Sequence, residues 1–129
     1  MPLTLVGLCG SLRAGSWNRK LMHEAAERFG DADFVDGNLR LPLYDGDAED
    51  RDGIPHEAQL LADQISTADA VIIASPEYNQ GPPGVLKNAF DWISRVDGKP
   101  WHDKPVALMT AAGGRAGGAR AQFALRLWL

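Results

Sequence analysis

Cysteine is almost absent from this sequence. The single residue, Cys9, cannot form a disulfide within the chain, which suits a reducing compartment such as the cytoplasm. Basic tracts are also missing, because 13 lysines and arginines face 17 aspartates and glutamates, for a net charge of −4. Binding to nucleic acid depends on a dense array of Lys and Arg, so we do not expect a nucleic-acid partner.

Long hydrophobic runs are missing as well. No apolar stretch approaches the roughly 20 residues that a membrane helix needs, so we expect no membrane association. Residues 1–8 are apolar, but they lack the basic start and the long apolar centre of a secretory signal. These absences together favour a cytoplasmic protein.

The composition that is present is typical of one globular domain over residues 1–129, with 45 % apolar and 23 % charged residues. Short runs rich in Val, Ile and Leu predict strands buried on both faces, at residues 3–8, 32–35, 70–74 and 106–109. Apolar residues at helical spacing lie between and after them, within residues 21–29, 54–65, 85–93 and 116–129. This alternation predicts an α/β fold with a doubly wound parallel sheet between two layers of helices.

One stretch between the predicted elements is polar. Residues 42–55 are rich in Asp and Gly and are predicted to form a long surface loop. In sheets of this kind, ligands bind beyond the carboxyl ends of the strands, near the point where the strand order reverses. The candidate site therefore lies in the loops after the first, third and fourth predicted strands.

The first of these loops reads G-S-L-R-A-G-S-W-N over residues 10–18. A loop that enters a helix offers free backbone N–H groups and the positive end of the helix dipole. Ser11, Ser16 and Asn18 add neutral donors, and Arg13 adds a fixed positive charge, so the loop could hold a phosphate monoester. An N-cap at Ser16 and a turn at Ser11 would explain the same pattern, and these residues alone leave both interpretations open.

Other phosphate chemistries do not match this loop. It has neither the Gly-Lys-Ser/Thr of a nucleoside-triphosphate loop nor the G-x-G-x-x-G of a dinucleotide loop. A cysteine-dependent phosphatase would need an arginine six positions after its thiolate, where Cys9 has Gly15. We therefore expect Cys9 to be a small buried residue at the end of a strand.

The other two loops offer weaker signals. Pro76, Glu77, Tyr78 and Asn79 could line a flat heterocycle, although an ordinary tight turn would look the same. Residues 110–118 are dense in glycine, which permits close approach of the backbone to a planar ligand. A plain surface loop would explain that segment equally well.

Taken in order, the three loops resemble the NAD(P)H-dependent FMN reductase family, which includes quinone, chromate and azo reductases. The pattern G-S-L-R-x-x-S-x-N is complete from Gly10 to Asn18, and P-E-Y-N is complete from Pro76 to Asn79. Three further segments also look like the family, at residues 41–44, 85–92 and 117–122. The similarity covers nearly the whole chain.

The resemblance implies a set of FMN-binding residues. Those holding or flanking the phosphate would be Ser11, Arg13, Ser16, Trp17 and Asn18. Those bordering the isoalloxazine, largely through main chain, would be Pro76, Glu77, Tyr78 and Asn79. Gly113 and Gly114 would approach the pyrimidine edge of the ring, and Ala112 stands at about the place where the family has a serine. No metal site and no dedicated catalytic acid or base is expected.

The resemblance also implies an activity and an assembly. FMN would pass two electrons from NAD(P)H to a quinone-like, azo, metal-oxyanion or flavin acceptor. The flavodoxin-like sheet of the family usually has five strands, and this chain stops near the end of its fourth helix. A fragment, or a partner subunit covering the gap in a homo-oligomer (dimer or tetramer), would account for this. A flavodoxin-like electron carrier and a truncated, non-catalytic domain are the alternative functions.

Overall fold

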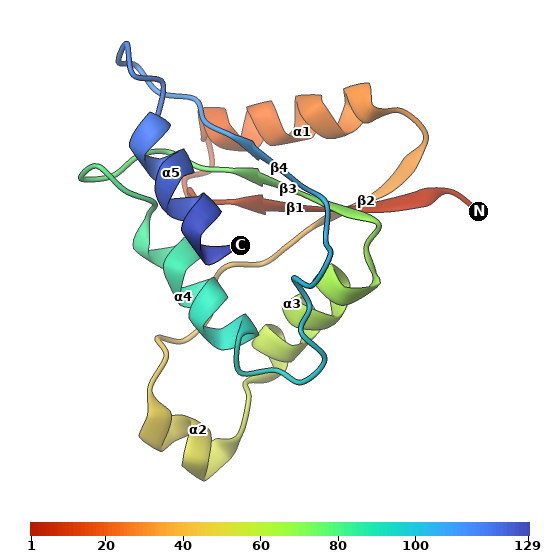
Figure 1. Ribbon diagram of the computed structural model, residues 1–129, viewed down its shortest axis with the longest axis vertical. Coiled ribbons are helices and arrows are strands. Elements are labelled where there is room, and N and C mark those ends of the chain that lie inside the picture. The colour runs from red at the N-terminus through yellow and green to blue at the C-terminus, as the bar shows by residue number, and fades with distance from the viewer.

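The computed structural model describes all 129 residues and contains one parallel sheet (Figure 1). Its strands lie in the order β2-β1-β3-β4, with the bounds β1 Leu3–Cys9, β2 Ala32–Asp36, β3 Ala70–Ala74 and β4 Val106–Met109. All four predicted strands are confirmed, and only the carboxyl ends of β1 and β2 extend one residue further. This order is that of a flavodoxin-like, doubly wound sheet up to its fourth strand, so the predicted fold class is confirmed.

Helices cover both faces of the sheet. Their bounds are α1 Trp17–Phe29, α2 Gly46–Asp52, α3 His56–Thr67, α4 Gly84–Ile93 and α5 Ala119–Trp128. Figure 1 shows α1 above the strands and α3 and α4 below them, and α5 joins the core of the α3 and α4 side through Leu125. No helix combines the length and the apolar character that a membrane crossing requires.

The prediction of a long loop over residues 42–55 is wrong for its central part, which forms α2. Asp45 caps this helix, because its side chain accepts a hydrogen bond from the backbone N–H of Asp47 at 3.0 Å. Gly53 ends it with a φ of 79°, a conformation that favours glycine. The acidic first turn suits the positive end of a helix, so the same Asp and Gly residues that suggested a loop define a short helix.

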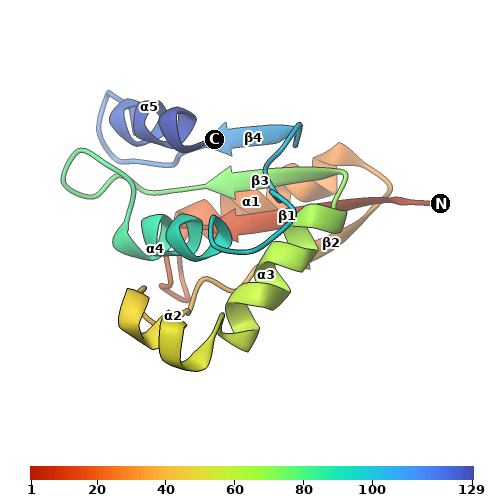
Figure 2. The same ribbon diagram turned by 60° about the horizontal axis from the view of Figure 1, so that its bottom comes forward.

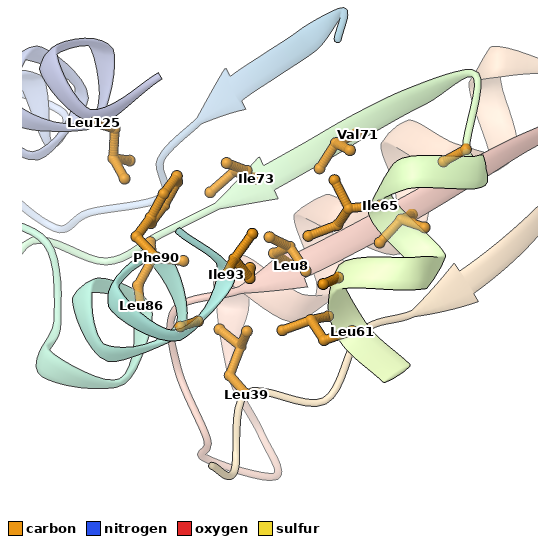
Figure 3. Close-up of a cluster of buried hydrophobic side chains, with 14 residues drawn as sticks. Leu8, Leu39, Leu61, Ile65, Val71, Ile73, Leu86, Phe90, Ile93 and Leu125 are labelled. Carbon is orange, nitrogen blue, oxygen red and sulfur yellow. The ribbon is translucent and has the colours of Figure 1, made fainter. Parts of the chain in front are cut away.

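Alternation along β1 divides the core into two clusters. Val6 and Leu8 belong to a cluster of 14 buried residues on the side of α3, α4 and α5. Leu5 and Cys9 point the other way and pack with Met22 of α1, since successive side chains of a strand face opposite sides. Figure 3 shows the larger cluster, whose Val, Leu, Ile and Phe side chains each contribute ~1.5–3 kcal/mol when fully buried. These two layers fix the sheet that carries the loops.

The segment before α2 is fastened to α4. The Pro42 carbonyl accepts hydrogen bonds from Asn88 Nδ2 at 2.9 Å and from Trp92 Nε1 at 2.7 Å. The Tyr44 N–H donates to Asn88 Oδ1 at 2.9 Å, and its ring packs edge-on against Trp92. Two segments that resemble the family, residues 41–44 and 85–92, therefore contact each other directly.

A charged group extends the same contact. Glu49 of α2 accepts hydrogen bonds from Arg95, at 3.0 and 3.1 Å, and from the Tyr44 hydroxyl at 2.8 Å. These bonds, the one from Arg95 first, lower the pKa of Glu49 below its ordinary value of 4.5. The same carboxylate raises the pKa of Tyr44, because it accepts a hydrogen bond from the protonated hydroxyl. An ion pair thus joins α2 to the end of α4.

Candidate functional site

The three candidate loops leave the sheet side by side. Beyond the strand ends, Gly10 N–H donates to the Ala74 carbonyl at 2.8 Å, and Ser75 N–H donates to the Met109 carbonyl at 3.0 Å. Figure 2 shows the arrows of β1, β3 and β4 pointing to the same end of the sheet, where these loops begin. The fold therefore brings the predicted site loops together at the edge where ligands bind to such sheets.

The first loop, residues 10–16, ends in the N-terminus of α1. Ser16 is the N-cap, and its Oγ accepts a hydrogen bond from Arg19 N–H at 3.2 Å. Ser11 Oγ accepts from Arg13 N–H at 3.3 Å and is buried with Ser16. The capping interpretation of Ser16 is thus correct. Its Oγ also lies 3.8 Å from Cys9 Sγ, within the distance of a weak hydrogen bond in which either atom could donate.

Backbone donors remain free at the start of α1. The N–H groups of Trp17 and Asn18 have no acceptor within the chain, as expected for the first turn of a helix. Arg13 is exposed and takes part in none of the ion pairs. The helix dipole, these N–H groups and an unpaired guanidinium all favour an anion at this place.

The second loop, residues 75–83, carries a tight turn. Tyr78 and Gly81 exchange backbone hydrogen bonds of 2.9 and 3.2 Å. Asn79 and Gln80 between them have φ angles of 51° and 66°, which is the geometry of a type I′ hairpin turn. The turn leaves the Tyr78 side chain 53 % exposed at the tip of the loop.

The third loop, residues 110–118, depends on a glycine at its end. Gly118 has a φ of 80°, and an added Cβ would lie 2.7 Å from Thr110 Cβ. The Thr110 hydroxyl in turn donates to the Gly117 carbonyl and accepts from Gln122 Nε2 at 2.8 Å. This arrangement closes the base of the loop, and residues 112–116 at its tip are exposed.

Side chains of the first two loops contact the third. Asn18 Oδ1 accepts from Ala111 N–H at 2.8 Å, and Asn18 Nδ2 donates to the Ala111 carbonyl at 3.1 Å. Glu77 Oε2 accepts from Ala121 N–H in the first turn of α5 at 3.0 Å. The three loops thus form one connected unit.

A hollow of about 190 Å³ opens where these loops meet. It is lined by Ser11, Arg13, Gly15, Ser16, Trp17, Asn18, Tyr78 and Ala111. The hollow is large enough to admit a phosphate group, and its lining combines hydroxyl, amide and guanidinium donors without a carboxylate. A larger hollow of about 590 Å³ adjoins it, with Trp17 and Ala111 shared between the two.

Comparison with known proteins shows the family of the chain. A sequence profile described as NADPH-dependent FMN reductase matches residues 3–129. The chain belongs to the NADPH-dependent FMN reductase family.

Named members of this group are similar over most of the chain. A quinone reductase of Escherichia coli (strain K12) is 42 % identical over 127 residues, which cover 96 % of this chain and 68 % of that protein. An NAD(P)H-dependent FMN reductase of Pseudomonas aeruginosa is 40 % identical over 126 residues, with the same coverage of each chain.

A solved structure shares the fold. The flavoenzyme NAD(P)H:(acceptor) oxidoreductase from Paracoccus denitrificans superposes with a TM-score of 0.81 at 37 % identity. The match covers 97 % of this chain and 68 % of that one. The chain therefore spans about two thirds of the length of these relatives.

FMN reductases need a place for the flavin phosphate, and the smaller hollow fits that group. All five residues of the first loop and the start of α1 that are predicted to lie at the phosphate line it, namely Ser11, Arg13, Ser16, Trp17 and Asn18. Of the second loop, Tyr78 joins them, whereas Pro76, Glu77 and Asn79 do not line it. The predicted third-loop residues Ala112 and Gly113 line the larger hollow, and Gly114 lies beyond them in the exposed tip.

Sequence reasoning missed several contributors to this site. Ala111 lines both hollows and binds Asn18 through its backbone, and no side-chain chemistry marks an alanine in advance. Lys20 places its Nζ 4.2 Å from the centroid of the Trp17 ring and lines the larger hollow. The only feature of the sequence that could have pointed to Lys20 is its position one helical turn after Ser16.

Proposed function

We propose that this chain binds FMN at the meeting point of its three loops and passes two electrons from NAD(P)H to a quinone-type acceptor. The observation that carries the proposal is the smaller hollow, which gathers hydroxyl, amide and guanidinium donors around the N-terminus of α1. Membership of the NADPH-dependent FMN reductase family supports the cofactor and the electron donor. The name of the Escherichia coli relative supports the acceptor class.

The chain holds the phosphate in this proposal. The Arg13 guanidinium supplies the compensating charge, Ser11 and Ser16 line the same hollow, and the N–H groups of Trp17 and Asn18 have no acceptor within the chain. Charge-assisted hydrogen bonds of this kind are about twice as strong as neutral ones. The phosphate end would therefore contribute a large part of the affinity for FMN.

The second and third loops border the ring. Pro76, Glu77, Tyr78 and Asn79 form one side, and the backbone N–H groups of residues 112–114, which have no acceptor within the chain, meet the polar edge. Ala112 has no hydroxyl to offer, so that contact would be made by main chain alone. Bound FMN supplies hydride acceptance from NAD(P)H and electron delivery to the acceptor. The chain binds and orients, with no side chain required to move a proton.

The assembly and location are part of the same proposal. We place residues 1–129 in one domain of a homo-oligomer, a dimer or tetramer, in the cytoplasm. Phe123 and Leu127 of α5 are 63 % and 85 % exposed, and large apolar side chains on one helix favour a protein contact. A single buried cysteine suits a reducing compartment. A light-scattering mass of one chain at micromolar concentration would contradict the oligomer.

Steady-state oxidation of NADPH and NADH by the FMN-loaded chain, with 1,4-benzoquinone as the acceptor, tests the function. We expect oxidation that requires both FMN and the quinone and that saturates in each. Tight FMN binding without oxidation of either nucleotide would instead favour an electron carrier. Failure to bind FMN would favour a non-catalytic domain, and the proposal would be wrong.

A further inference from the structure

The glycine-rich third loop has almost no side chains with which to hold itself. Its exposed tip, residues 112–116, consists of alanine, glycine and one arginine. Thr110 closes the base through the Gly117 carbonyl and Gln122, but this contact does not orient the loop toward its neighbours. Glycine-rich backbone loses much conformational freedom on ordering, so some other part of the molecule must fix its place.

The start of the loop is held by the first loop. The side chain of Asn18 is buried, with 4 % of the residue exposed. Its amide makes both hydrogen bonds to the backbone of Ala111, pairing with the N–H and the carbonyl of that one residue. One Nδ2 hydrogen and one lone pair of Oδ1 remain outside this pair.

The end of the loop is held by the second loop. The N-cap of α5 is Gly118, which has no side chain to cap the helix. Glu77 takes that role from a distance of 44 positions along the chain, by accepting the Ala121 N–H. A carboxylate also complements the positive end of the helix dipole, so the contact is both a hydrogen bond and a charge interaction.

The held loop keeps its own donors free. None of the N–H groups of residues 112–116 has an acceptor within the chain. The loop therefore has one anchor on each side, at Ala111 and at Ala121, and a row of free N–H donors between them. Such an arrangement suits a preformed binding edge, because donors that are already in place lose less conformational entropy when a ligand binds.

We propose that Asn18 and Glu77 are positioning residues, which fix the third loop so that its backbone donors meet the flavin ring. This inference rests on the proposed function, since it assigns these residues within that site. It departs from the expectation that Asn18 is chiefly a phosphate ligand. It also couples the phosphate end to the ring end, because Asn18 lines the phosphate hollow while holding Ala111.

Comparison of FMN with riboflavin, which lacks the phosphate, separates the two roles. In Asn18→Ala and Glu77→Ala, we expect the dissociation constants of both flavins to rise by the same factor, about tenfold each. The ratio of the two constants then stays at the wild-type value. Glu77→Gln keeps an acceptor for Ala121 N–H and should recover most of the loss. Arg13→Ala serves as the reference, since it should weaken FMN alone.

Amide hydrogen exchange tests the anchors without any flavin. Exchange at Ala111 should become faster in Asn18→Ala, and exchange at Ala121 faster in Glu77→Ala, while core amides such as Val71 keep their protection. Unchanged exchange at both amides would overturn the positioning role by itself. Loss of FMN affinity alone in Asn18→Ala would show a direct phosphate contact and overturn it too. Failure of the wild-type chain to bind either flavin would overturn the proposed function instead.

Discussion

The first and third loops differ in the groups that they present at the strand ends: the first presents side chains, and the third presents backbone N–H groups. The first loop, residues 10–16, and the start of α1 carry their chemistry in side chains, and five of these gather at one hollow. The third loop, residues 110–118, offers backbone only and is held by Asn18 and Glu77 from the other loops. Candidate side chains can be predicted from a sequence, because their residue types are visible in it. The position of a backbone segment depends on contacts with residues from other parts of the chain.

The largest effect should come from the glycines of the third loop. Gly118→Ala combines a φ of 80° with a Cβ 2.7 Å from Thr110, so we expect a loss of about 2–3 kcal/mol in the free energy of unfolding. Gly117→Ala has the positive φ of 61° but open space around it, so about 1 kcal/mol is expected. Gly114→Ala meets neither obstacle and is the control. Urea unfolding measures the free energy of unfolding of the three variants. Equal losses in all three would contradict the roles given to the positive φ and to the contact with Thr110.

The next largest effect should come from Arg13→Ala in the first loop, and it concerns the affinity for FMN. Removing a charge-assisted contact costs about 1.5–3 kcal/mol, so FMN affinity should fall roughly 10- to 100-fold. Arg28→Ala, at the far end of α1 and 80 % exposed, is the matched control and should bind FMN normally. Fluorescence titration measures both. An unaltered affinity in Arg13→Ala would place the phosphate elsewhere.

Ser16 separates capping from ligand binding. Ser16→Ala removes the acceptor for Arg19 N–H and should lower the free energy of unfolding by about 1 kcal/mol. Ser16→Asp keeps an N-cap acceptor but adds a negative charge beside the hollow, so stability should stay near wild type while FMN affinity falls about tenfold or more. Thermal unfolding and FMN titration of both variants check this, and tight FMN binding by Ser16→Asp would exclude a phosphate there.

The smallest effect lies outside both loops, at Glu49. The folded state lowers the pKa of this carboxyl, so its contribution to stability is present above the ordinary pKa of 4.5 and is lost as the pH falls through the lower, folded value. Near-ultraviolet circular dichroism of the Tyr44 and Trp92 pair should show an acid step below pH 4.5 that Glu49→Gln lacks. FMN affinity at neutral pH should not change in this variant.

Much of the fold could be predicted from the sequence, because short apolar runs and their spacing report burial directly. All four strands are examples. The helix α2 was missed because Asp and Gly are common both in loops and at helix ends, and only the structure shows that Asp45 and Gly53 cap the two ends of one short helix.

The site divides in the same way. That Arg13 and Ser16 lie together at the N-terminus of a helix could be predicted from the loop that precedes the helical pattern. The bonds of Asn18 to Ala111 and of Glu77 to Ala121 join residues 93 and 44 positions apart. Contacts between residues so far apart in the sequence form only once the sheet is assembled, and the residue types of the two partners do not predict them. The contact of Pro42 with Asn88 and Trp92 is a further case.

The central claim is that the first loop holds the phosphate of a flavin. Titration of the purified chain with FMN and with riboflavin tests it most directly, because the two ligands differ only in that group. The account predicts that FMN binds at least about tenfold more tightly than riboflavin and that Arg13→Ala removes most of the difference. Equal affinity for the two flavins would contradict it.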